Sequence, residues 1–244
     1  MLRRPRPNLA GEIAVKRERG KRTITRKVSF RSVHLAVRYK TLHFPVDPVE
    51  LAQIVPEAGY VVADRDLLSV PFGARVSMSG ALATKGDAEL RVNSERCILA
   101  IRGRDPDPVV DEFETVEHLL AERFEFDSRS ASVFYELLAE LTVASAESPL
   151  AVMARQFRAV AVLNRLGEVL GFPVSNFALR SVGAGQDPGD NNWSEVRIEP
   201  SIPDSTRRFF VSIVFRNEQR DVVVEFARSL ARTVSRLVEE IERP

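Results

Sequence analysis

The order of local signals in residues 32–124 recurs in residues 132–241. Each segment begins with an apolar strand that starts with Ser-Val and continues into a proline-containing helix start. A Gly-aromatic-x-Val motif follows, then a Glu-x-Arg strand, and each segment closes with a helix that opens on Val-Val-x-Glu-Phe, at Val109 and at Val222. No single match is specific, but the shared order is. The sequence therefore predicts one unit written twice, which constrains the fold strongly and the chemistry very little.

Each copy reads as strand, helix, several antiparallel strands and helix, which predicts an α+β fold. The helices are expected to cover one face of the sheet and to leave the other face open or turned to a partner. The predicted organisation is a basic N-terminal arm over 1–29 with a β-hairpin after residue 12, a first repeat over 30–126, a join over 127–131 and a second repeat over 132–244.

Three helices carry apolar stripes at spacings of three and four residues, which is typical of a core-facing helix. The first runs from Asp107 as N-cap and Pro108 as first helical residue. A long helix is predicted from Pro149 to about Leu170, with Gly171 at its end. The last helix covers residues 222–241. All three stripes are expected to lie in the core.

The charge is divided sharply between the arm and the body. Residues 1–31 hold eleven Lys and Arg against two Glu, which gives +9; because the whole chain is +1, the remainder carries −8. Such asymmetry bears on partners rather than on fold.

The arm has two candidate partners. A basic ribbon can lie along a phosphate backbone, where counterion release makes affinity depend on salt. It can equally dock on an acidic protein partner or on its own acidic body. The candidate nucleic-acid contacts, for DNA or RNA, are Arg3, Arg4, Arg6, Lys16, Arg17, Arg19, Lys21, Arg22, Arg26 and Lys27.

The order of elements in residues 30–241 resembles that of the TATA-box-binding protein family. The resemblance implies a continuous saddle-shaped sheet with helices on the convex side, and a concave face that wedges phenylalanines into the minor groove of DNA. Phe72 and Phe177 precede equivalent strands and match one member of each phenylalanine pair. Val92 and Ile198 stand where the second members would be.

The sheet face itself carries mixed charge. Two-residue alternation places Glu89 with Arg91, and Glu195 with Arg197, on one face. Glutamates repel phosphate, so this face is predicted to suit cross-strand pairing or a protein contact better than DNA. Arg91 and Arg197 stay candidates for sheet-face contacts.

No catalytic or metal-binding constellation stands out. The three histidines, His34, His43 and His118, lack a second ligand at metal spacing. The sequence therefore predicts a non-enzymatic binding protein without cofactor or metal. A protein adaptor or complex subunit is the alternative, and a ligand or enzymatic site between the repeats, lined by Trp193 and Tyr135, is a third.

The lone Cys97 falls in an apolar strand and is predicted to be a core residue. No run of apolar residues reaches the length of a membrane span, and the basic start lacks the apolar stretch of a secretory signal. A cytoplasmic location without membrane contact is expected.

Overall fold

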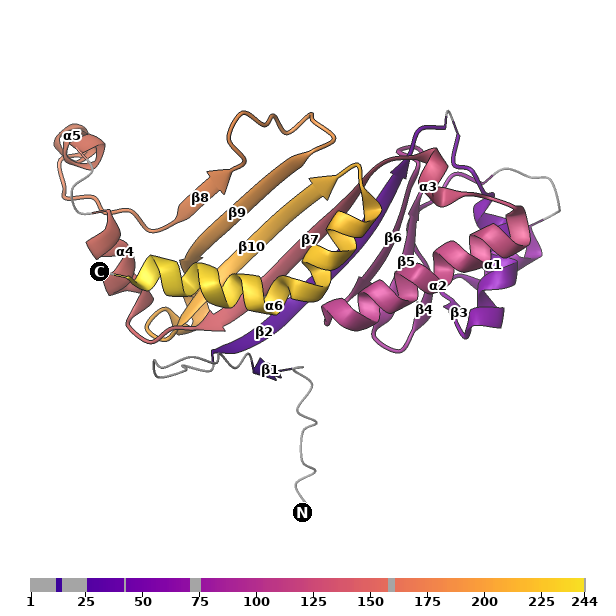
Figure 1. The fold of residues 1–244 in the computed structure, drawn as a ribbon, viewed down its shortest axis with the longest axis horizontal. Coiled ribbons are helices and arrows are strands. Elements are labelled where there is room, and N and C mark those ends of the chain that lie inside the picture. The colour runs from indigo at the N-terminus through magenta and orange to yellow at the C-terminus, as the bar shows by residue number, and fades with distance from the viewer. Residues whose placement is uncertain (1–11, 15–25, 42, 71–75, 158–160, 244) are drawn as a thin grey trace, which may run out of the picture.

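The computed structural model describes residues 12–14, 26–41, 43–70, 76–157 and 161–243. These residues form an α+β arrangement in which an antiparallel sheet is covered on one face by helices (Figure 1). The strands follow the order β3-β4-β5-β6-β2-β7-β10-β9-β8, and β1 pairs with β2.

The two longest strands lie side by side in the middle of the sheet. β2 (Lys27–Tyr39) and β7 (Ser132–Ala144) run antiparallel along almost their whole length. On the side of β2 lie β6 (Ile98–Gly103), β5 (Ala88–Asn93), β4 (Ser79–Lys85) and β3 (Val61–Val62). On the side of β7 lie β10 (Arg208–Asn217), β9 (Trp193–Pro200) and β8 (Leu179–Val182).

Alternation along these strands separates a core face from an open face. Val33, Leu35 and Val37 of β2 are fully buried and lie opposite core residues of β7. The residues between them, His34 and Arg38 among others, point to the other side of the sheet because successive side chains alternate. One face of the sheet therefore carries the core and the other is left without helices.

Two long helices cover the core face. α2 (Pro106–Phe124) packs on β6 and β2, and α6 (Arg220–Glu242) packs on β7, β10 and α2 (Figure 1). The apolar stripe predicted for α2 is buried. The helix begins two residues earlier than its sequence suggested, because the Asp105 carboxylate, not that of Asp107, caps it by accepting from the Asp107 amide.

The helix predicted from Pro149 to about Leu170 is interrupted after Gln156, although both halves contain helix. The structure has two helices instead, α4 (Pro149–Gln156) and α5 (Ala161–Leu170). Met153 of α4 is buried as expected, but Leu166 and Leu170 of α5 are about half exposed. α5 lies off the end of the sheet (Figure 1), so its apolar stripe finds no core to enter.

Shorter elements fill the remaining connections. α1 (Pro48–Ile54) begins where the Asp47 carboxylate accepts from the Val49 amide, and α3 (Ser128–Ala131) occupies the join predicted at 127–131. Three 3₁₀ turns cover Val55–Ala58, Arg65–Ser69 and Ile202–Asp204. Gly59 closes the first of them with a φ of 83°, in the left-handed region that favours glycine.

The described part of the arm joins the sheet directly. β1 (Glu12–Ala14) pairs antiparallel with the start of β2, with Ile13 opposite Val28. The rest of the hairpin predicted after residue 12 lies outside the described residues. Among the helices that the structure describes, none has both the length and the apolar character of a membrane span.

Candidate functional site

The open face of the sheet holds more positive than negative side chains. By strand register, nine basic and five acidic residues of the described strands point to this side. The basic residues are Lys27, Arg31, Arg38, Arg91, Arg102, Arg180, Arg197, Arg208 and Arg216. The acidic residues are Glu89, Glu136, Glu140, Glu195 and Glu199. Lys27 and Arg31 belong to the basic segment 1–31. The acidic remainder of the chain therefore contributes seven basic and five acidic residues to this face, a formal surplus of two positive charges.

Exposure increases this imbalance at Glu89, Glu195 and Glu199, because each is less exposed than the arginine that pairs with it. Arg216 and Glu136 differ, since they are 15% and 17% exposed. The Arg180 side chain is 69% exposed whereas its partner Glu195, 2.7 Å away, is 15% exposed. Arg197 and Glu199 show the same contrast, at 51% and 12%. The glutamates counted from the sequence as repulsive to phosphate thus lie beneath guanidinium groups, and the face presents mainly positive charge.

Glu89 anchors the other half of the face in the same way. Its carboxylate lies 2.7 Å from Arg91 and 4.0 Å from Arg102, and it is less exposed than either arginine. Glu140 of β7 is the exception, because it is exposed.

Arginines also cover the aromatic rings of this face. The Arg216 guanidinium lies 4.3 Å from the centre of the Phe134 ring and 5.6 Å from that of Trp193. Arg31 lies 5.2 Å from the centre of the Phe210 ring. The negative face of an aromatic ring attracts a guanidinium group, so these cation–π contacts stabilise the arginine over the ring. The aromatic residues of the described open-face strands are therefore capped by cations rather than offered as bare rings.

A shallow hollow lies in the middle of the face, between β6, β2, β7 and β10. Its volume is about 400 Å³, and His34 lies on its floor with Arg91 and Arg102 on one flank and Glu140 on the other. The His34 Nε2 is buried and has no hydrogen-bond partner. Burial, with help from Arg91 and Arg102 and against Glu89, lowers the pKa of His34 to about 4, so this imidazole is neutral at pH 7.

One predicted phosphate contact has a structural role instead. Arg26 is 6% exposed and forms a bidentate pair with Glu242 at the end of α6, and it also donates to the Ala144 carbonyl. Glu242 further accepts from Ser145 and from the Ala146 amide. Arg26 therefore fixes the base of the arm to the body. The prediction that it contacts nucleic acid is wrong, because its guanidinium group is buried against Glu242.

Among the other arm candidates, Lys27 is exposed on the open face. The remaining eight, Arg3, Arg4, Arg6, Lys16, Arg17, Arg19, Lys21 and Arg22, lie outside the described residues.

Within the described part of the chain, the structure does not bring together the residues that the family resemblance suggests as wedging side chains. Phe72 lies outside the described residues, and Phe177 is 46% exposed just before β8. Val92 and Ile198, at the positions expected for the second phenylalanines, are buried on the core side. A pair of wedging side chains is thus not assembled in the described sheet.

The proposed pocket lined by Trp193 and Tyr135 is not formed. Tyr135 is buried under the helices, where its ring meets Phe113 edge to face. Trp193 lies on the opposite, open face beside Arg216.

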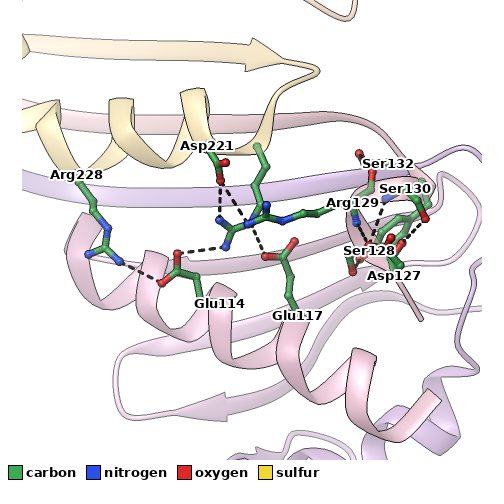
Figure 2. Close-up of polar contacts among 11 residues, drawn as sticks. Glu114, Glu117, Asp127, Ser128, Arg129, Ser130, Ser132, Asp221 and Arg228 are labelled. Atoms are coloured by element: carbon green, nitrogen blue, oxygen red, sulfur yellow. Dashed lines mark hydrogen bonds and ion pairs between the residues drawn. The ribbon is translucent and has the colours of Figure 1, made fainter. Parts of the chain in front are cut away.

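The helical side of the molecule contains a second polar cluster, at the junction of α2, α6 and α3. Arg220 is only 11% exposed, and its guanidinium pairs with Glu117 at 2.7 Å, with Glu114 at 3.2 Å and with Asp221 at 3.2 Å. Burial raises the pKa of Glu117, and its contact with Arg220 opposes that rise. Figure 2 shows Glu114 and Glu117 of α2 pointing toward Asp221 and Arg228 of α6.

A hollow of about 540 Å³ adjoins this cluster. Its rim includes the Asp127 carboxylate, which caps α3 by accepting from the Arg129 and Ser130 amides. Together, α2 and α6 hold eleven acidic and five basic residues, a formal surplus of six negative charges. The two long helices are therefore opposite in net charge to the open sheet face.

Sequence reasoning found Arg91 and Arg197 on the open face but missed Arg31, Arg38, Arg102 and Arg180. The odd or even position of each residue within its strand could have placed these arginines on the open face. That count needs the first residue of each strand and the position of the bulge near Arg31, and local sequence patterns determine neither.

The described residues contain no group of three or more His, Cys, Asp or Glu side chains placed to hold a metal ion. Cys97 is buried, and its thiol lies 3.3 Å from the Thr41 carbonyl oxygen. A scan against protein-family models and a search of curated proteins gave no match to this chain.

Proposed function

We propose that this chain is a non-enzymatic binding protein that contacts nucleic acid through its basic arm and through the arginines of the open sheet face. The observation that carries the proposal is the arrangement of charge on that face, where arginines stand outward over more deeply placed glutamates. Guanidinium groups pair well with phosphate oxygens, and such contacts make affinity depend on salt.

The position at which the arm joins the sheet supports this proposal. β1 joins the sheet beside the start of β2, at the end of the open face where Lys27, Arg31 and Arg208 lie. Arg26 fixes this junction to α6 through Glu242. A strand held by the sheet arginines would therefore come within reach of the arm, and the two cationic parts would act as one surface.

The net negative charge of α2 and α6 would also orient an approaching polyanion. The acidic residues of these helices repel phosphate, so a polyanion approaching the molecule is steered to the sheet side. The body would then serve as the scaffold that presents the arm.

We also propose that the two halves are copies of one unit in an arrangement like that of the TATA-box-binding protein. The support is the strand order, in which β6-β5-β4 flanks β2 as β10-β9-β8 flanks β7. The capped rings Phe134 and Phe210 set this face apart from the wedging face of that family, so contacts to phosphate are expected to dominate over insertion between bases.

The proposal is tested by fluorescence anisotropy with a labelled oligonucleotide over a range of salt concentrations. The full chain is compared with a variant that lacks residues 1–24. This deletion removes eight basic and two acidic residues, a net charge of +6, together with β1, and keeps Arg26. We expect the full chain to bind DNA and RNA of mixed sequence, with affinity that falls steeply as salt rises. The truncated chain should bind more weakly and with a shallower salt slope.

If the full chain binds neither polymer at low salt, the proposal fails and the adaptor alternative takes its place. Equal affinity of the two chains would instead remove the arm from the interface.

A further inference from the structure

We propose that the hollow over His34 binds one nucleotide unit, with the phosphate on the Arg91 and Arg102 flank and an amino-bearing base on the Glu140 flank. This inference rests on the proposed function, since the hollow lies in the middle of the proposed nucleic-acid face. The hollow would distinguish one base from another, whereas the rest of the surface would contact only phosphate.

The cationic flank provides the contact for an anion. Arg91 and Arg102 both reach over Glu89, are one third and one half exposed, and so keep donors available to solvent. An arginine offers five N–H donors in a planar fork, more than one carboxylate uses. The two guanidinium groups are thus able to take a phosphate while they stay near Glu89.

The His34 imidazole supplies an additional polar group at the floor. Its Nε2 is buried and without a partner, which is costly for a polar atom unless a ligand or water satisfies it. Arg91, Arg102 and burial disfavour the imidazolium, while Glu89 favours it and Glu140 lies across the hollow. A neutral imidazole that donates from Nε2 would complete the phosphate contact.

The remaining walls suit a base. Leu138 of β7 and Val214 of β10 lie opposite each other in the register and line the hollow with aliphatic surface. Glu140, two residues from Leu138 on the same face, directs an acceptor toward the same space. A carboxylate accepts from the exocyclic amino group of adenine, whereas the ring N–H of uracil lies between two carbonyl oxygens that repel a carboxylate.

The size and the spread of charge agree with this ligand. A volume of about 400 Å³ falls within the range of small-molecule sites, roughly 300–1,000 Å³. Arg102 and Glu140 lie on strands two apart in the sheet, about 10 Å across. A ligand must therefore carry its anionic group and its N–H donor at opposite ends, as a nucleotide does.

The test uses the full chain with ¹³C-labelled histidine, followed by NMR as adenosine 5′-monophosphate, uridine 5′-monophosphate or inorganic phosphate is added. Three histidines give three reporters, and His43 and His118 serve as internal controls. We expect the His34 signal alone to shift and its pKa to rise above about 4 when a phosphate binds. The adenine nucleotide should bind roughly tenfold more tightly than the uracil nucleotide, as one good base contact allows.

Two variants separate the flanks. Arg102→Gln should weaken all three ligands by a similar factor, whereas Glu140→Ala should remove the preference for adenine and leave inorganic phosphate binding intact or stronger. Glu225→Ala, an exposed glutamate on α6, is the matched control and should change neither.

The outcomes keep the two proposals apart. If the His34 signal does not move with any ligand while the chain still binds an oligonucleotide, the hollow is not a nucleotide site and the proposed function stands. If His34 responds equally to the adenine and uracil nucleotides, the base contact is overturned. If no oligonucleotide binds, the proposed function fails, and an unmoved His34 then overturns the hollow as well.

Discussion

The open sheet face and the helical face are both built from arginine–carboxylate pairs, but they present opposite charges to solvent. On the sheet, Arg180 is 69% exposed over a Glu195 that is 15% exposed. On the helices, Arg220 is 11% exposed beneath an Asp221 that is 75% exposed. The same residue types therefore make a basic surface on one side and an acidic surface on the other, according to which partner lies deeper.

The difference follows from the geometry of the two surfaces. A strand side chain stands roughly perpendicular to the sheet, so a short glutamate stays near the surface while a longer arginine extends over it. Arg220 instead enters the junction between α2 and α6, where three carboxylates surround it. The helical arginine is enclosed by carboxylates, whereas Arg180 and Arg197 of the sheet stay exposed to solvent.

The largest expected effect tests this division through stability. Arg220→Ala leaves the largely buried Glu117 without its cation and should lower the free energy of unfolding by about 3–5 kcal/mol. Arg102→Ala on the sheet removes a solvent-exposed group and should cost less than about 1 kcal/mol. Urea denaturation of the two variants measures both values. Equal losses would show that the two faces do not differ in this respect.

The pH dependence of stability tests the sheet side alone. His34 has a pKa of about 4 when folded and about 6.5 when unfolded, so the unfolded chain binds more protons between these values. Its contribution to stability is fully present above pH 6.5 and decreases as the pH falls to 4, by about 3 kcal/mol in total. His34→Gln should flatten the curve of unfolding free energy against pH by that amount. An unchanged curve would place His34 in contact with solvent.

A smaller effect is expected where arginine caps an aromatic ring. Arg31→Ala uncovers Phe210 and should lower stability by about 0.5–1 kcal/mol, the usual value of an exposed cation–π contact. Arg232→Ala, on an exposed position of α6, is the matched control and should change stability by less than about 0.5 kcal/mol. Thermal unfolding of both variants measures the two losses of stability. Equal losses would show that the contact of Arg31 with the Phe210 ring contributes nothing.

Much of the strand and helix order could be predicted from sequence, because apolar periodicity is a local property. The stripe of α6 and the alternation of β10 are examples, and both lie where their residues indicated. The stripe of α5 looks the same from sequence, yet it stays exposed because burial depends on what lies opposite a helix.

The candidate site was less predictable for the same reason. Counting charges gave Glu89 and Glu195 the same weight as Arg91 and Arg197 on the face. Depth beneath a neighbouring guanidinium is a property of the assembled sheet and has no signal in the order of residues. The role of Arg26 was hidden too, since its partner Glu242 lies near the other end of the chain.

The central claim is that the sheet face, and not the helical face, holds nucleic acid, and one pair of matched variants tests it. Arg102→Gln with Arg180→Gln neutralises two exposed arginines of the sheet, and Arg232→Gln with Arg236→Gln neutralises two of α6. Binding of a labelled duplex is measured by anisotropy against salt concentration. The sheet pair should lower the slope of log affinity against log salt by about two and the helix pair should leave it unchanged. An equal change in both, or a change in the helix pair alone, would contradict the assignment of the two faces.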